Sequence, residues 1–118
     1  MDDQFLRQLK KGVLEMLVLG LVCDQPTYGY ELLARLGKQS AGLFQMKEGT
    51  LYPILYRLED GGLIASRWQQ AESGRGSPKK IYAATGAGRD ALSKQRAVWA
   101  QFRDGVDQLC TEETNHGA

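Results

Sequence analysis

Side chains that commonly catalyse reactions or bind metals are scarce in this chain. The only histidine is His116, and the two cysteines, Cys23 and Cys110, are too few for a disulfide scaffold. We therefore expect neither a histidine-based catalytic site nor a zinc site with several protein ligands. A glycine-rich phosphate-binding loop is also missing from the sequence, so we expect no catalytic residue, no metal and no cofactor. A redox role for the cysteines stays open beside passive packing.

Residues 47–60 combine a leucine stripe with hydrogen-bonding side chains. Leu51, Leu55 and Leu58 recur at helical spacing and predict a buried helix face. Pro53 has no N–H group, so we expect it in the first turn of a helix that begins near residues 48–50. The other face of such a helix can enter a major groove, or it can simply be solvated. Its candidate DNA contacts are Lys47, Thr50, Tyr52, Pro53, Tyr56 and Arg57.

A basic, glycine-rich segment follows this helix. Four basic residues and one acidic residue lie between positions 67 and 80, in a chain whose net charge is only +1. Such a hairpin tip suits phosphates or the minor groove, although charge on a loop can also serve solubility alone. The candidate DNA contacts here are Arg75, Lys79 and Lys80. The hydroxyl groups of Tyr28 and Tyr30 could reach phosphates, or the two rings could brace the helix that they begin.

Periodicity and turn residues indicate the elements that position these side chains. We expect helices over residues 5–23, 28–37 and 47–60, the second one capped by Thr27 and ended by Gly37. Strands are expected over 63–71 and 79–84, and Thr85 should cap a helix that runs to about residue 110. The fold class is therefore mainly α with a small β-hairpin. The predicted organisation is a winged helix-turn-helix domain (1–84), a long C-terminal dimerisation helix (85–110) and a flexible tail (111–118).

The last helix predicts a second subunit. Leu92, Trp99 and Val106 are spaced by seven residues. At about 39 Å the helix is too long for so small a domain to cover. A second copy is the simplest partner, and a two-fold dimer would read a pseudo-palindromic site. The dimerisation candidates are Leu6, Leu9, Leu92, Trp99, Phe102, Val106 and Leu109. Trp99 is either core or, paired across the two-fold axis, a stacking surface for a planar hydrophobic ligand.

The chain lacks membrane and targeting signals. Its longest apolar run, residues 13–23, is about half of the ~20 residues that a bilayer span needs. The first residues have neither a basic region nor a small-residue cleavage site. We therefore expect a cytoplasmic protein that makes no membrane contact.

Three motifs together resemble the PadR-like family of bacterial transcriptional regulators. They are Tyr28-Gly29-Tyr30-Glu31-Leu32, Gly49-Thr50-Leu51-Tyr52-Pro53 with its continuation to Ile64, and the wing segment from Gly74-Arg75 to Tyr82. The resemblance covers about residues 9–109. It implies a winged-helix dimer, usually a repressor, that reads its operator with the third helix and the wing. Some family members respond to phenolic acids or drugs, and Trp99 falls where a ligand-stacking tryptophan lies in such members.

These observations lead to one functional expectation and one alternative. We expect a sequence-specific, homodimeric repressor that binds double-stranded DNA at a pseudo-palindromic operator and is released by a small planar or aromatic ligand. The alternative is a winged-helix protein-interaction module that does not bind DNA. The basic wing favours the first interpretation, because an interaction module has no need of phosphate-binding charge.

Overall fold

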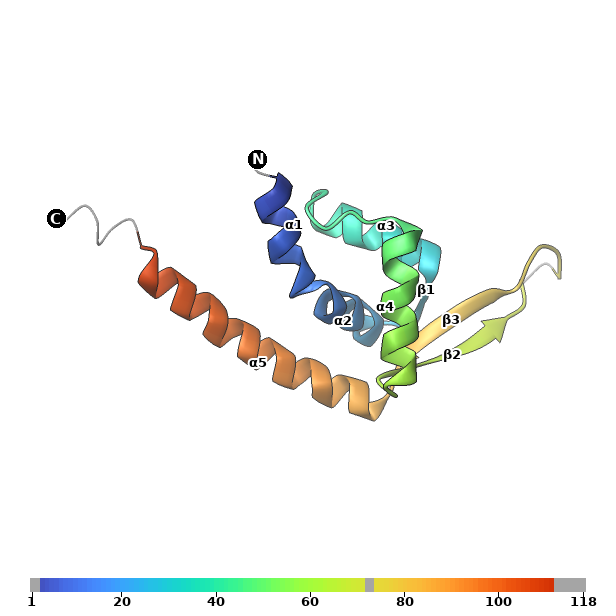
Figure 1. Ribbon diagram of the computed structural model, residues 1–118. Coiled ribbons are helices and arrows are strands. Elements are labelled where there is room, and N and C mark those ends of the chain that lie inside the picture. The colour runs from blue at the N-terminus through green and yellow to red at the C-terminus, as the bar shows by residue number, and fades with distance from the viewer. Residues whose placement is uncertain (1–2, 72–73, 112–118) are drawn as a thin grey trace.

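Leucine-rich helices pack on one face of a small sheet to form the body of the protein, and one long helix leaves that body (Figure 1). The computed structural model describes residues 3–71 and 74–111. In order, the elements are α1 (Asp3–Lys11), α2 (Leu14–Asp24), β1 (Thr27–Tyr28), α3 (Gly29–Gln39), α4 (Glu48–Asp60), β2 (Ile64–Gln69), β3 (Lys79–Ala84) and α5 (Gly86–Leu109). The mainly helical, winged helix-turn-helix architecture with a long C-terminal helix is confirmed.

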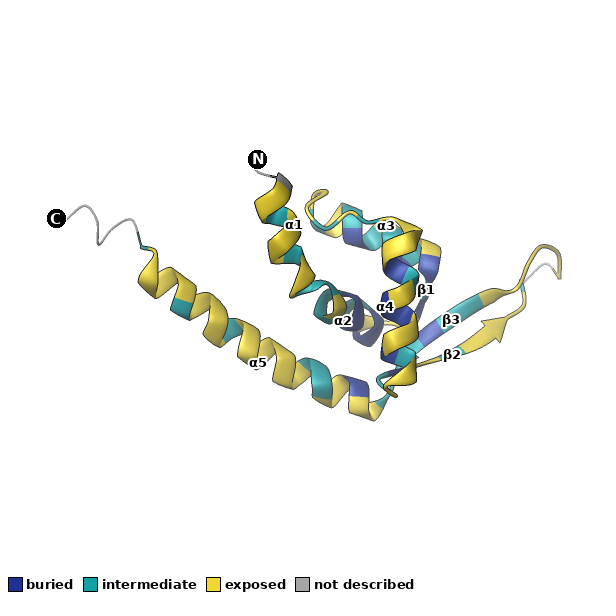
Figure 2. Ribbon diagram, in the orientation of Figure 1, coloured by how far each residue is buried: buried dark blue, intermediate teal, exposed yellow. Residues whose placement is uncertain are grey.

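The single helix predicted over residues 5–23 is wrong, because the chain breaks it into α1 and α2. Glycine loses more backbone entropy in a helix than any other residue, and Gly12 stands at the break. The N–H of Val13 donates to the carbonyl of Lys10 at 3.0 Å, which closes α1 with a turn. The N–H of Leu17 then donates to the carbonyl of Val13 at 3.0 Å as α2 begins. The break lets α2 enter the core while α1 lies outside it (Figure 2).

The start of α3 also differs from the prediction. Thr27 does not cap the helix with its side chain, since its hydroxyl donates to the carboxylate of Glu31 at 2.5 Å. Thr27 and Tyr28 instead form β1, which pairs with β3 and adds a third strand to the predicted hairpin. Two residues are too few for a detectable strand pattern.

The end of α3 lies at Gln39, two residues beyond the predicted end at Gly37. Ala41 and Gly42 have positive φ angles of 52° and 86°. The N–H of Gly42 returns to the carbonyl of Gly37 at 2.7 Å. The left-handed turn that ends a helix therefore forms at Ala41 and Gly42, and Gly37 remains helical.

Helix α4 is confirmed with its buried stripe. Leu51, Leu55 and Leu58 lie in the core with Ile54, and they pack against α2, α3 and the sheet. The helix begins at Glu48, so Pro53 lies in its second turn and not in the first as predicted. The carbonyl that Pro53 leaves without its helical donor belongs to Gly49, which is exposed, so the lost hydrogen bond costs little.

The sheet has the strand order β1-β3-β2, with antiparallel pairing throughout. Ser66 pairs with Tyr82, and Trp68 pairs with Lys80. Strand β2 ends at Gln69, two residues short of the predicted end. Because side chains alternate along a strand, Ile64, Ser66 and Trp68 share the face that covers the core. Arg67 and Gln69 lie on the opposite face.

Helix α5 begins as predicted, with Thr85 as its cap. The hydroxyl of Thr85 accepts from the N–H of Gly88 at 3.0 Å and donates to the carbonyl of Gly62 at 2.6 Å. A Cβ atom on Gly88 would lie 1.9 Å from the carbonyl oxygen of Leu63. Only glycine therefore allows this close approach of α5 to the turn between α4 and β2. Beyond its first two turns α5 is largely exposed (Figure 2).

The rest of the C-terminal prediction is only partly covered by the structure. The flexible tail predicted over residues 111–118 lies, from residue 112 onward, outside the described residues, as does His116. No helix within the described ranges is both long and apolar enough to cross a membrane.

Candidate nucleic-acid interface

The outer face of α4 presents the side chains predicted there as candidate DNA contacts. Thr50, Pro53 and Tyr56 are exposed. Lys47 is also exposed, just before the helix begins. The guanidinium of Arg57 is exposed but not isolated, because its Nε donates to the carboxylate of Glu15 on α2 at 2.6 Å. Arg57 is thus paired with a residue of α2, while its side chain stays 58% exposed.

Tyr52 lies differently from its neighbours, at the junction of α3 and α4. Its ring is half-buried and packs against the core. A Cβ atom on Gly29 would lie only 2.2 Å from the Tyr52 hydroxyl oxygen, so the ring fits against the bare backbone at the start of α3. Tyr52 also lies beside Tyr56, with ring centres 6.1 Å apart. Its packing contacts join the two helices of the helix-turn-helix.

Two predicted contacts near the start of α3 have different surroundings. Tyr30 is 74% exposed. Tyr28 is half-buried, and the Nζ atom of Lys79 lies 4.3 Å from the centre of its ring. This cation–π contact joins β1 to β3 and fixes one wing cation beside α3.

Lys80 lies on the opposite face of the sheet, turned toward α4. Its Nζ is 3.9 Å from the carboxylate of Glu59, and the other Glu59 oxygen accepts from the Ser66 hydroxyl at 2.5 Å. The same Nζ lies 5.7 Å from the ring centre of Tyr82. Burial, and to a smaller extent the nearby carboxylate of Glu59, raises the pKa of Tyr82 to about 12. Glu59 therefore connects the last turn of α4 to both strands of the wing.

The loop between β2 and β3 lies at the end of the molecule opposite the C-terminus of α5 (Figure 1), and Arg75 belongs to this loop. It is exposed, and it stands between Gly74 and Gly76, whose φ angles are 71° and 85°. These left-handed conformations suit glycine, and they turn the chain sharply on either side of Arg75.

Sequence reasoning missed Glu15 and Glu59, the two carboxylates that hold candidate DNA-contacting cations. Glu15 interrupts an otherwise apolar run, which was a usable signal for a partner on another element. Nothing in the spacing of Glu59 indicated that it would meet the wing, because that contact depends on how the sheet folds back on α4.

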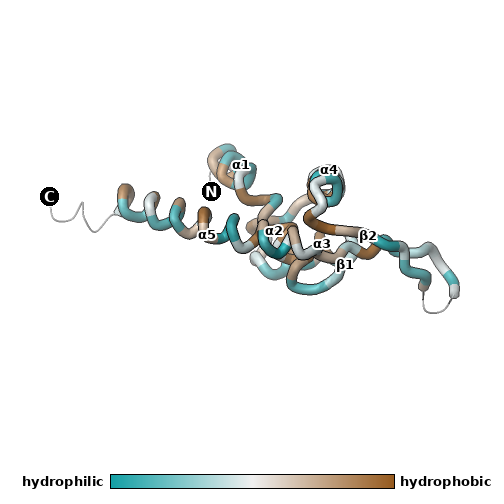
Figure 3. Tube along the Cα trace, turned by 90° about the horizontal axis from the view of Figure 1, so that it is seen from below, coloured by the Kyte–Doolittle hydropathy of each residue, from teal (hydrophilic) through white to brown (hydrophobic). Residues whose placement is uncertain are grey.

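The dimerisation candidates divide into two groups. Phe102 and Leu109 are 61% and 87% exposed, and Val106 and Leu9 are exposed as well. The rings of Trp99 and Phe102 stack, with centres 6.2 Å apart. Leu92, in contrast, packs on α2, with its Cδ1 atom 3.8 Å from the Cβ position of Gly20, and Leu6 is half-buried. Apolar stretches recur along the far half of α5 in Figure 3.

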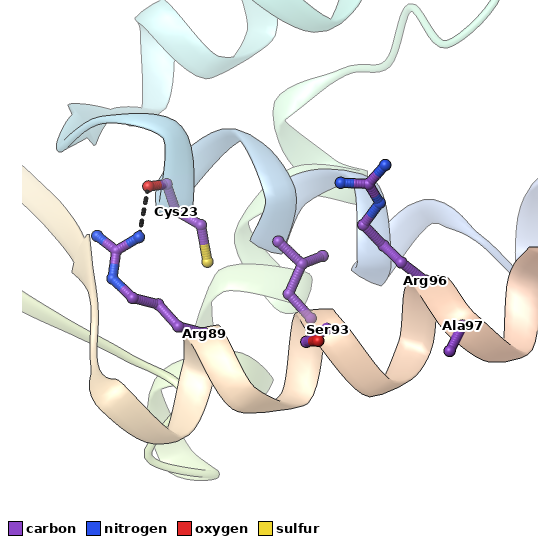
Figure 4. Close-up of a pocket in the computed structure, with 6 residues that line it drawn as sticks. Cys23, Arg89, Ser93, Arg96 and Ala97 are labelled. Carbon is purple, nitrogen blue, oxygen red and sulfur yellow. Dashed lines mark hydrogen bonds between the residues drawn. The ribbon is translucent and has the colours of Figure 1, made fainter.

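A shallow hollow of about 490 Å³ lies between α2 and the first half of α5 (Figure 4). Arg89 reaches across it and donates to the carbonyl of Cys23 at 3.0 Å, and Ser93 and Arg96 line it as well. Burial raises the pKa of the Cys23 thiol, more than the charge of Arg89 lowers it. The protonated thiol is a poor nucleophile, which favours passive packing for Cys23. The hollow does not include Trp99.

The helix-turn-helix formed by α3 and α4, with the β2–β3 hairpin beside it, defines the class of winged helix-turn-helix DNA-binding proteins. Within that class, the chain belongs to the PadR-like family of transcriptional regulators, whose sequence profile matches residues 18–94. It is therefore a DNA-binding regulator of transcription and not an enzyme.

Individual relatives agree with this assignment. The chain is 33% identical over 91 residues to a transcriptional regulator of Mycobacterium tuberculosis. The aligned segment covers 77% of this chain and 79% of that protein. A PadR family regulator from Eggerthella lenta is 36% identical, with a TM-score of 0.79 over 90% of this chain and 88% of that one. A PadR-like regulator from Bacillus cereus is 31% identical, with a TM-score of 0.75 over 86% of this chain and 95% of that one.

Proposed function

We propose that the protein is a homodimeric transcriptional repressor that binds a pseudo-palindromic operator and is released by a planar aromatic ligand. The observation that carries this proposal is the uncovered apolar stripe on α5, formed by Trp99, Phe102, Val106 and Leu109. Apolar surface of this extent and regularity calls for a partner, because each fully buried side chain of this size stabilises an assembly by roughly 1.5–3 kcal/mol.

A second copy of the chain fits this stripe. The heptad spacing on α5 suits helix-to-helix packing with an identical partner, and Phe5 and Leu9 on α1 offer further exposed apolar surface. Such a dimer would carry two α4 helices and two wings. A two-fold protein reads two half-sites of opposite orientation, which predicts an inverted repeat.

The ligand part of the proposal rests on Trp99. Trp99 is 39% exposed and does not line the hollow between α2 and α5. A planar molecule would need a second flat surface, and the Trp99 of the other copy supplies one in a two-fold dimer. Release of DNA would follow if the ligand favoured a dimer whose two α4 helices are wrongly spaced. The repressor role rests on the family resemblance.

Selection from random duplex DNA, followed by binding of the enriched sequence over a salt series, tests the DNA-binding part. We expect an inverted repeat and an affinity that falls steeply with salt, with log K changing by about 0.9 per phosphate contact for each decade of salt concentration. Triple substitution of Arg75, Lys79 and Lys80 by alanine should flatten that slope. If folded, dimeric protein enriched no sequence and bound no DNA at low salt, the proposal would fail and a protein partner would become the better hypothesis.

Two further measurements test the repressor and ligand parts. A reporter gene downstream of the enriched sequence should be silenced by the wild-type protein. The Arg57→Ala variant should not silence it, so that reporter expression is restored. Planar aromatic compounds should quench tryptophan fluorescence in the wild type but not in Trp99→Leu, and the same compounds should restore reporter expression. Activation of the reporter, or quenching that survives Trp99→Leu, would contradict these parts.

A further inference from the structure

Trp68 is the largest exposed side chain on the wing, and none of the functions described above uses it. It is 68% exposed, and it shares a sheet face with Ile64 and Ser66. Because Ser66 bonds to Glu59 on α4, this is the face turned toward α4. Trp68 lies two residues further along β2, about 7 Å closer to the wing tip.

Trp68 lies among groups that suit a phosphate backbone. Its cross-strand neighbour is Lys80, whose Nζ lies 6.0 Å from the centre of the indole ring. The Lys80–Glu59 separation of 3.9 Å is long for an ion pair, so Lys80 is only loosely held. On α4, Tyr56 is exposed and lies three residues before Glu59, on the same side of the helix. The surface between α4 and the wing thus carries an indole N–H, an ammonium group and a phenol hydroxyl, three hydrogen-bond donors.

The geometry of DNA determines which part of the duplex would lie over the surface between α4 and the wing. Neighbouring major and minor grooves are separated by one sugar–phosphate strand. If α4 occupies a major groove and the wing an adjacent minor groove, that strand crosses the surface between them. A strand of phosphates and apolar sugar faces matches an amphipathic indole, whose ring packs on sugar while its N–H donates to a phosphate oxygen.

We propose that Trp68 is a DNA-contacting residue, placed with Lys80 and Tyr56 to receive the sugar–phosphate strand that runs between the two grooves. The proposal rests on the DNA-binding function proposed above and adds a residue to it. The contact is to the backbone, so it strengthens binding to every sequence alike. A second copy of the chain is a poor alternative occupant, since the wing points away from the exposed part of α5 (Figure 1).

Fluorine NMR of protein labelled with 5-fluorotryptophan tests this contact directly. The chain has two tryptophans, and the resonance missing from Trp68→Phe is that of Trp68. Addition of a mixed-sequence duplex at low salt should shift the Trp68 resonance, and high salt should reverse the shift. Because the probe is a mixed-sequence duplex, the test does not require the operator to be known.

Affinity measurements with a matched control complete the test. Trp68→Ala should weaken binding about tenfold for both the mixed-sequence duplex and the enriched operator, because a hydrogen bond to a charged group is lost with the sugar packing. Trp68→Phe should lie between that variant and the wild type. Gln69→Ala, an exposed change on the opposite face of the same strand, should stay within about twofold of wild type.

The outcomes separate the two proposals. An unshifted Trp68 resonance together with wild-type affinity for Trp68→Ala, while the wild type binds DNA, would overturn the Trp68 contact and leave the proposed function intact. Loss of dimer in Trp68→Ala with unchanged DNA affinity per dimer would also overturn it, by assigning Trp68 to a contact between copies. No DNA binding by the wild type would remove both proposals together.

Discussion

The ammonium group of Lys79 lies 4.3 Å from the centre of the Tyr28 ring, so the wing and the strand before α3 share one cation–π contact. On the other face of the sheet, Lys80 lies beside Glu59 of α4. The two consecutive lysines therefore face different parts of the body. The Lys79–Tyr28 contact on one face and the Ser66–Glu59 hydrogen bond on the other hold the wing in place before nucleic acid binds, which lowers the ordering cost of binding.

The contact between Lys79 and Tyr28 predicts separable effects on stability and on DNA binding. Tyr28→Leu should lower the free energy of unfolding by about 0.5–1 kcal/mol, whereas Tyr28→Phe should retain most of the contact. Lys79→Ala should also reduce the salt slope of DNA binding by about 0.9 if Lys79 meets one phosphate. Urea unfolding and binding over a salt series measure the two effects. Equal stability of Tyr28→Leu and Tyr28→Phe would contradict the predicted effect on stability.

Gly88→Ala should be strongly destabilising. Its Cβ would lie 1.9 Å from the carbonyl oxygen of Leu63. To relieve this clash, the backbone of α5 or the backbone of the turn before β2 would have to move. We expect a loss of at least about 2–3 kcal/mol, measured by urea unfolding at fixed protein concentration. Gly86→Ala is the matched control, because no atom lies within 4 Å of its Cβ position. A Gly88→Ala variant as stable as Gly86→Ala would contradict the close approach of α5 to this turn.

Phe102→Asp should convert the protein from a dimer to a monomer. A carboxylate in the middle of the apolar stripe would have to be desolvated in the assembly without a partner. Sedimentation velocity measures the change, and weaker operator binding should accompany it because each monomer reads only one half-site. Gln101→Asp adds the same charge on the polar side of α5 and should remain dimeric. Dimerisation of Phe102→Asp at wild-type strength would exclude the α5 stripe as the interface.

Tyr82 predicts a loss of stability in alkali. Its pKa is about 12 in the folded protein and about 10 in an unfolded chain. Between these values the folded state binds more protons than the unfolded state, so stability falls as pH rises from about 10 to 12. The loss should be on the order of 2 kcal/mol, and Tyr82→Phe should lack it. The difference in phenolate absorbance between wild type and Tyr82→Phe should titrate near pH 12; a midpoint near 10 would refute the assignment.

The parts of the fold that the sequence predicted are those encoded by neighbouring residues. The leucines at positions 51, 55 and 58 share one helix face, and Thr85 is followed three residues later by the N–H group that it caps. These signals lie within a turn or two of the chain. The basic wing and its flanking glycines are local signals as well.

The features that the sequence did not predict depend on distant residues. Thr27 is a good helix cap by its type, yet its pairing with Tyr82 makes it a strand residue. The helical spacing of apolar residues across positions 6–21 hid the break between α1 and α2, because a single glycine such as Gly12 weakens a helix without always ending it. The ion pair of Arg57 joins positions 42 residues apart. For such contacts, periodicity carries no information about which residue will be the partner.

The Thr85 hydroxyl donates to the carbonyl of Gly62 and accepts from the N–H of Gly88, and these two bonds give α5 the mechanical character of a lever arm. Its 24 residues extend about 36 Å from a fulcrum that is bonded to the turn after α4. A tilt of about 10° at the fulcrum displaces the far end of the arm by roughly 6 Å, nearly two base-pair steps of about 3.4 Å. If the far ends of two such arms are pinned against each other, the same small tilt displaces the two α4 helices along the DNA axis instead.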